Sequence, residues 1–172
     1  VIVRDVSKRV GKNDDLRNVS IEVDPGTVVG LQGINGSGKT MLMRAVCGLI
    51  RPTEGEIIID GQRLGADISF PPSLGMLIEA PSFLGYLSGY DIRSALRLVG
   101  LDADEKKKFR AYSLGMKQRL GIAAAIMEKP KLLVLDEPTN ALDEAGVEML
   151  KRVVAMAAST GREVLLSSHD GE

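Results

Sequence analysis

Glycines and a lysine at fixed spacing in the segment GINGSGKT, residues 33–40, predict a loop that binds phosphate groups. The segment matches G-x-x-x-x-G-K-[ST], follows the apolar stretch 28–31 and opens a helical pattern, as a nucleotide-binding loop requires. Backbone N–H groups can converge on phosphate oxygens there, and the helix N-terminus adds partial positive charge. We expect Lys39 to reach the β- and γ-phosphates and the Thr40 hydroxyl to bind Mg²⁺. The residues expected to contact the nucleotide are Gly33, Ile34, Asn35, Gly36, Ser37, Gly38, Lys39 and Thr40.

Two acids directly follow the apolar run LLVL, residues 132–135. Asp136, at the carboxyl end of a buried strand, would lie beside the hydration shell of the metal. Glu137 could then orient or deprotonate an attacking water. Two ordinary turn residues are the alternative, and the phosphate loop in the same chain favours the catalytic interpretation.

The only histidine, His169, follows a further apolar stretch, residues 164–166. A single histidine most often has a structural role. If its strand lies beside the strand that carries Asp136, the imidazole would instead reach the γ-phosphate, and we favour that interpretation.

Periodicity predicts an α/β framework beneath these side chains. In the expected helix 91–99, the apolar residues Ile92, Ala95, Leu96 and Val99 form one buried stripe. The run LLVL indicates a strand buried on both faces, as in a parallel sheet. Residues 83–111 lie between sheet segments and read as purely helical, which suggests a separate arm. The expected strands are residues 1–6, 19–23, 27–31, 56–59, 74–78, 131–135 and 163–166, and the expected helices are 38–49, 91–99, 113–127 and 144–158.

Composition limits the classes of function. The chain has 172 residues, 44% of them hydrophobic and 26% charged, as expected for one soluble globular domain. A net charge of −1, with no tryptophan and three residues each of Phe and Tyr, argues against a nucleic-acid partner. The single cysteine, Cys47, favours a reducing compartment and a buried thiol. No apolar stretch is long enough to span a bilayer, so a membrane role would require a partner.

The order of the remaining motifs resembles the nucleotide-binding subunit of an ABC transporter. YSLGMKQRLGIA, residues 112–123, precedes LLVLDEPTNALD, residues 132–143, and SSHD, residues 167–170, follows. They are similar to the signature, Walker B, D-loop and H-loop motifs of that family. The resemblance implies a P-loop NTPase sheet core with an antiparallel β portion at the N-terminus and a short inserted α-helical arm. A single domain 1–172 would then comprise a nucleotide-binding core, 1–78 and 114–172, and an arm, 79–113.

The same resemblance assigns roles to residues. It implies that Glu137 is the catalytic base, assisted by Lys39 and by His169 as the switch histidine. Mg²⁺ would be held by Thr40, Asp136 and Glu79. Ser113 and Gly115 would contact ATP across the interface with a second subunit, and Asp143 would communicate between the subunits.

Four features depart from the family pattern. The signature reads YSLGM where the family has LSGGQ, a form similar to that of bacitracin-resistance and lantibiotic-immunity transporters. Glu79 stands where the family has glutamine; we hypothesise that it couples Mg²⁺ occupancy to the position of the arm, and a solvated loop acid is the alternative. No aromatic precedes Phe70, so no ring can stack on adenine from the region of Val10 and Gly11, and we expect loose base selection. The arm is short, with 33 residues between Glu79 and Ser113.

The sequence therefore predicts an ATP-hydrolysing subunit that powers transport across a membrane, with an antimicrobial peptide or drug as the candidate cargo. Its expected partners are ATP, a second copy of itself or a similar subunit, and separate transmembrane permease subunits. Its expected location is cytoplasmic, peripheral on the inner face of the cell membrane. Two alternatives stay open at this point: a soluble ABC-type ATPase, and a nucleotide-binding regulator with weak turnover.

Overall fold

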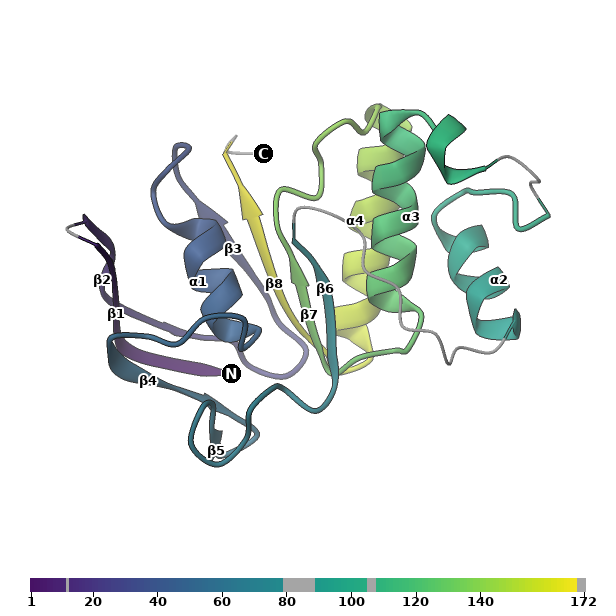
Figure 1. Ribbon diagram of the computed structural model, residues 1–172. Coiled ribbons are helices and arrows are strands. Elements are labelled where there is room, and N and C mark those ends of the chain that lie inside the picture. Colours follow the sequence, from purple (N-terminus) through teal and green to yellow (C-terminus); the bar gives the residue numbers. More distant parts are fainter. Residues whose placement is uncertain (12, 79–88, 105–107, 170–172) are drawn as a thin grey trace.

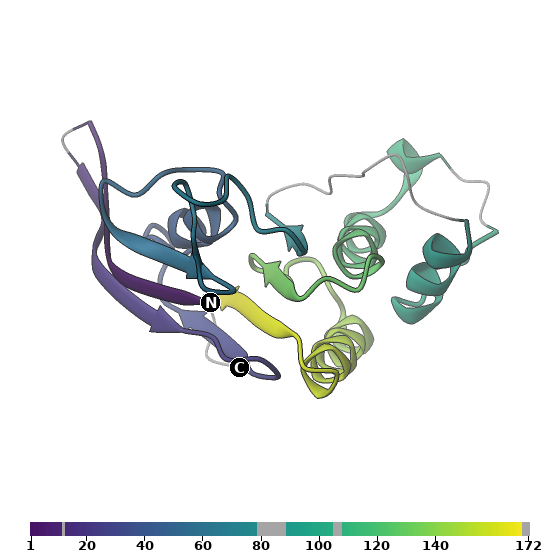
Figure 2. The same ribbon diagram turned by 90° about the horizontal axis from the view of Figure 1, so that it is seen from below.

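The computed structural model describes residues 1–11, 13–78, 89–104 and 108–169 (Figure 1). In the described residues, a parallel sheet lies at the centre, with helix α1 and an antiparallel sheet on one face and helices α3 and α4 on the other (Figures 1 and 2). Helix α2 lies outside α3, on the side away from the sheet. The expected α/β class, with an antiparallel portion at the N-terminus, is confirmed.

The antiparallel sheet has the strand order β2-β1-β4-β5. Strand β1 pairs with β2 on one side and β4 on the other. Its register shifts near Asp5, whose φ of 48° is left-handed, as expected for a bulge in a twisted strand. The bounds are β1 Ile2–Val10, β2 Asn13–Glu22, β4 Glu54–Ile59 and β5 Gln62–Arg63.

The parallel sheet has the order β3-β8-β7-β6. All four residues of β7 are buried, which confirms that LLVL is covered on both faces. Because every pairing is parallel, the carboxyl ends of these strands meet at one edge of the sheet. The bounds are β3 Val28–Gln32, β6 Leu74–Leu77, β7 Leu132–Leu135 and β8 Glu163–Ser168.

Helices cover both faces of this sheet. Helix α1, Lys39–Val46, packs with the antiparallel sheet into one hydrophobic cluster, which includes the fully buried Cys47. Helices α3, Leu114–Ile126, and α4, Glu144–Ser159, form the second cluster on the opposite face. The central sheet is thus clamped between two cores, which fixes the edge where its strands end.

The arm contains α2, Gly89–Leu98, and the short 3-10 helix η1, Phe109–Ala111. Ala95 and Val99 are buried against α3 as predicted, and Leu96 is partly buried. Ile92 does not belong to the buried stripe: it is 36% exposed, because it lies outside the hydrophobic cluster that Ala95, Leu96 and Val99 share with α3.

Candidate functional site

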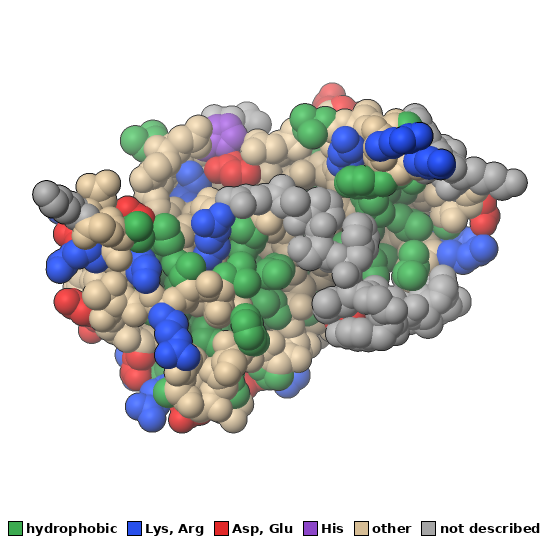
Figure 3. Space-filling view, in the orientation of Figure 1, with side chains coloured by type: hydrophobic (Ala, Val, Ile, Leu, Met, Phe, Trp, Pro, Cys, Tyr) green, Lys and Arg blue, Asp and Glu red, His purple; other side chains and the backbone are tan. Residues whose placement is uncertain are grey.

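The candidate site lies where three strands of the parallel sheet end. Strand β3 leads into the loop 33–38, β7 leads into Asp136 and Glu137, and β8 leads to His169. β8 lies between β3 and β7, so the predicted adjacency of the His169 and Asp136 strands is confirmed. At the upper edge of the molecule, the purple of histidine borders the red of acidic side chains (Figure 3).

The loop between β3 and α1 has a backbone that requires glycine. Gly36 and Gly38 have φ of 81° and 93°, values that residues with a Cβ seldom adopt. A Cβ on Gly38 would also stand 2.6 Å from the backbone oxygen of Asp15. The motif therefore requires glycine at position 38 for a local reason, since no other residue type fits between the loop and β2.

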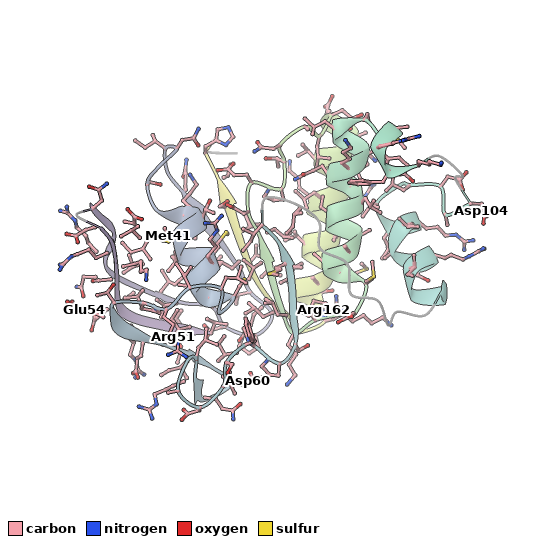
Figure 4. All side chains as sticks on the ribbon, in the orientation of Figure 1. Met41, Arg51, Glu54, Asp60, Asp104 and Arg162 are labelled. Atoms are coloured by element: carbon pink, nitrogen blue, oxygen red, sulfur yellow. The ribbon has the colours of Figure 1, made fainter. Side chains whose placement is uncertain are left out.

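A cavity of about 360 Å³ opens beside this loop. Met41 and Arg44 on α1, Asp15 on β2 and the acid Glu137 line it together with the loop, and Met41 is labelled in Figure 4. Gly33 and Ile34 do not line it, and the Ile34 side chain is 80% exposed. Six of the eight expected loop contacts face the cavity: Asn35, Gly36, Ser37, Gly38, Lys39 and Thr40.

Lys39 is held at the mouth of the loop. Its Nζ donates to the carbonyl oxygens of Gly33 at 2.6 Å and Ile34 at 3.2 Å. The same ammonium group lies 3.5 Å from Glu137 Oε1, and its side chain is 9% exposed. A cation so placed can contact a phosphate in the cavity and the acid on the opposite side.

Asp136 joins the loop helix to the neighbouring strand. The hydroxyl of Thr40 donates to its Oδ2 at 2.6 Å, and the hydroxyl of Ser167 donates to its Oδ1 at 2.6 Å. Ser167 is fully buried, and its oxygen also accepts the backbone N–H of Glu137 at 2.8 Å. Sequence reasoning missed Ser167; its position two residues before His169 was the available signal.

Glu137 and His169 are in direct contact. The Nδ1 atom of the imidazole lies 2.5 Å from Glu137 Oε2. Burial alone would raise the pKa of Glu137, but the hydrogen bond and charge of His169, with Lys39 adding to them, outweigh burial and hold the pKa below its usual value. The acid is therefore ionised at neutral pH and accepts hydrogen bonds only, so Nδ1 carries the proton. A water on the cavity side would face an ionised base.

The backbone at Glu137 is unusual. Its φ is 46°, in the left-handed region that non-glycine residues seldom occupy. Such a conformation persists only where the surroundings impose it, and it occurs preferentially at functional sites.

The signature residues lie at the N-terminus of α3. Ser113 caps this helix, and its oxygen accepts the N–H of Met116 at 3.2 Å. A Cβ on Gly115 would stand 2.8 Å from the carbonyl oxygen of Ala141, so glycine allows α3 to approach the segment after Asp136. Neither residue lines the cavity beside Lys39, and Leu114 between them is 71% exposed.

Asp143 caps α4. Its Oδ1 accepts the N–H of Gly146 at 2.9 Å and a hydrogen bond from Arg119 at 2.8 Å. The Gly146 N–H and the guanidinium of Arg119 together hold the pKa of Asp143 below its usual value.

The residues present fit a magnesium ion. Thr40 and Asp136 supply a hydroxyl and a carboxylate oxygen that are already in contact, beside a cavity suited to phosphates. Mg²⁺ typically takes one or two such protein ligands, and phosphate oxygens and water complete its shell. Among the described side chains, no group of three His, Cys, Asp or Glu gathers as a metal cage. Glu79 lies outside the described residues.

The fold and this site define a P-loop nucleoside triphosphatase. Residues 16–140 match the ABC transporter family, and the chain belongs to that family. As a member, it is an ATP-binding subunit that hydrolyses ATP, which confirms the main sequence-based interpretation over its two alternatives.

Several curated relatives are similar along nearly the whole chain. An uncharacterised ABC transporter ATP-binding protein, YybJ of Bacillus subtilis (strain 168), is 42% identical over 186 residues, covering 99% of this chain and 85% of the relative. The lantibiotic transport ATP-binding protein SrtF of Streptococcus pyogenes is 37% identical, covering 97% of this chain and 79% of SrtF. The bacitracin transport ATP-binding protein BcrA of Enterococcus faecalis is 36% identical, and the match covers 95% of this chain but 59% of BcrA.

Solved structures agree with the fold. An ATP-binding subunit of an ABC transporter superposes with a TM-score of 0.82 at 28% identity, over 98% of this chain and 78% of the other. The dimeric bacterial ABC transporter cassette MJ0796 gives 0.85 at 25% identity, over 98% and 88%. Within the described part of the chain, no helix combines the length and apolarity needed to cross a membrane.

Proposed function

We propose that the residues gathered at the sheet edge hydrolyse ATP in the presence of Mg²⁺. The observation that carries this proposal is the contact of Glu137 with His169 at 2.5 Å and with Lys39 at 3.5 Å, beside the paired Thr40 and Asp136. The loop amides and Lys39 bind the phosphates. Glu137 accepts a proton from the attacking water, and His169 orients Glu137. Thr40 and Asp136 hold the metal ion, which neutralises charge on the phosphates when bound.

The chain functions as a dimer of two similar subunits. Ser113 and Gly115 are expected nucleotide contacts, yet they lie at the N-terminus of α3 and do not line the chain's own cavity. A second copy can present this helix end to the phosphates, where its partial positive charge favours binding. The MJ0796 cassette is dimeric in its solved structure, which supports this arrangement.

The ATPase acts on a separate membrane-spanning partner at the cytoplasmic face of the membrane. The names of SrtF and BcrA, transport ATP-binding proteins, support this proposal. The same names, with the signature form YSLGM, favour a peptide antibiotic as the cargo. The match with YybJ extends over 186 positions, more than this chain has residues, so the relative has residues that this chain lacks. This agrees with a shortened arm, residues 79–113, between the core segments 1–78 and 114–172.

Removing the base is the direct test. Glu137→Gln should lower kcat by about 100-fold or more, the range of general-base catalysis, while binding of a fluorescent ATP analogue persists. Glu148→Gln is the matched control, since Glu148 forms its ion pair with Lys151, along α4 and away from the cavity. ATP and Mg²⁺ should convert the Glu137→Gln variant to a dimer in size-exclusion chromatography. A wild-type chain that binds ATP without turnover would contradict the proposed roles of these residues.

A further inference from the structure

Two adjacent side chains of α3, Gln118 and Arg119, contact the segment between Glu137 and Asp143, and the mechanism above uses neither. We propose that they are positioning residues through which α3 sets the place of the catalytic base and links it to the arm. This inference rests on the proposed role of Glu137.

Gln118 holds the backbone of the base. Its Nε2 donates to the carbonyl oxygen of Pro138 at 3.1 Å and lies 3.4 Å from that of Glu137. Only the amide nitrogen can face two carbonyl oxygens, so the orientation of the side chain is determined. The N–H of Glu137 is bound on the opposite side by Ser167. The strained φ of 46° at Glu137 is therefore imposed from both sides, by β8 and by α3.

Arg119 ties α3 to both neighbouring helices. One guanidinium nitrogen donates to the carbonyl oxygen of Val99, just past the end of α2, at 3.2 Å. The other donates to Asp143, the cap of α4, at 2.8 Å. The side chain is 20% exposed and lies against Gly100 and Gly146, which have no side chains to displace it.

Gln118 and Arg119 are adjacent residues of α3, so their contacts shift together when the helix moves. A displacement of α2 that moves the Val99 carbonyl acts on Arg119, and through the same helix on Gln118 and the peptide of Glu137. We therefore expect a loss of either side chain to misplace the base without removing any group that touches the nucleotide.

The main test is steady-state ATP hydrolysis by the full chain. Gln118→Ala should lower kcat about 5- to 10-fold, as one lost hydrogen bond predicts, with KM and affinity for the fluorescent ATP analogue unchanged. Gln118→Glu, which sets a carboxylate against two carbonyl oxygens, should lower kcat by up to about 100-fold. Gln62→Glu makes the same chemical change on the exposed strand β5 and should match the wild type.

A second variant separates the two contacts. Arg119→Lys can reach one acceptor at a time and should retain more of kcat than Arg119→Met, with Arg152→Met on the exposed face of α4 as the control. Wild-type kcat in Gln118→Glu overturns the inference. The inference is also overturned if the loss of kcat comes together with weaker nucleotide binding and a lower melting temperature, since this would show a merely structural role. If wild-type protein neither binds nor hydrolyses ATP, the proposed function fails, and the inference with it.

Discussion

The catalytic edge and the arm are built in opposite ways. At the edge, hydrogen bonds join Thr40, Asp136, Ser167, Glu137 and His169 in one continuous chain, in which the Ser167 hydroxyl accepts the backbone N–H of Glu137. In the arm, helix α2 packs mainly on α3 among the described elements, and Ile92 and Leu98 are exposed. The edge is fixed by strand register, whereas α2, in the described part of the arm, is held by apolar contacts with α3 and by the hydrogen bond of Arg119 to Val99. The comparison predicts that α2 opens at a lower free energy than the edge of the sheet does.

The largest effect should follow from closing the phosphate loop. Gly38→Ala combines a left-handed φ with a backbone clash at 2.6 Å, so the loop must shift. We expect affinity for the fluorescent ATP analogue to fall by more than about 100-fold, close to 3 kcal/mol. Gly161→Ala is the control, because its φ of 82° is equally strained but nothing stands near the added atom. Equal nucleotide affinity in both variants would contradict the prediction.

Next in size is the loss of the buried hydroxyl that joins β8 to β7. Ser167→Ala leaves the N–H of Glu137 and an oxygen of Asp136 without their partner, at a cost of about 3 kcal/mol. Urea unfolding should show this loss, and ATP turnover should fall with it. Ser159→Ala removes a hydroxyl that bonds to a carbonyl of its own helix and should have little effect. If Ser167→Ala and Ser159→Ala unfolded at the same urea concentration, the hydrogen bonds of Ser167 would not stabilise the edge.

A smaller effect is expected in the arm. Val99→Ala opens a cavity in the contact of α2 with α3 and should cost about 2 kcal/mol, while Ile92→Ala at the exposed position should cost less than about 1 kcal/mol. Hydrogen exchange should become faster in α2 of the Val99 variant and stay unchanged in β7. Equal acceleration in both elements would show that edge and arm unfold as one unit.

The smallest effect concerns pH. Because its folded pKa is depressed, the ionised Asp143 contributes stability above its unfolded pKa of about 3.9 and loses it as pH falls through the folded value. Asp143→Asn should therefore unfold at lower urea concentration than wild type at pH 7, and the difference should shrink as pH falls through the depressed folded pKa. A difference that persists at low pH would assign the effect to side-chain shape.

Much of the framework was predictable because its signals are local. Apolar runs indicated each strand of the parallel sheet, and the glycine spacing indicated the loop, since position 38 admits glycine only. Strand β1 continues to Val10 and β2 begins at Asn13, beyond the expected strands 1–6 and 19–23, through residues that are mostly polar. There, pairing with the neighbouring strand satisfies the backbone, although no apolar pattern marks it.

Only those residues of the site that belong to a recognisable sequence motif could be predicted. The grouping of Lys39, Asp136, Glu137 and His169 followed from strand order. Ser167 follows from the pairing of β8 with β7, and its position before His169 was the only signal for it. The contacts of Gln118 and Arg119 depend on how α3 packs, and no spacing within the sequence specifies them. The exposure of Ile92 likewise depends on which face of α2 turns toward α3, which periodicity alone placed one residue too wide.

The left-handed backbone at Glu137 lowers the stability of the fold at the residue that ATP hydrolysis requires. Glycine or asparagine would occupy this conformation at lower energy, so a collection of variants selected only for heat resistance should drift toward them and lose the base. This chain, with glutamate in a left-handed conformation, carries a local conformational cost together with the base. A relative with glycine at this position would be expected to bind nucleotide firmly and release it uncleaved.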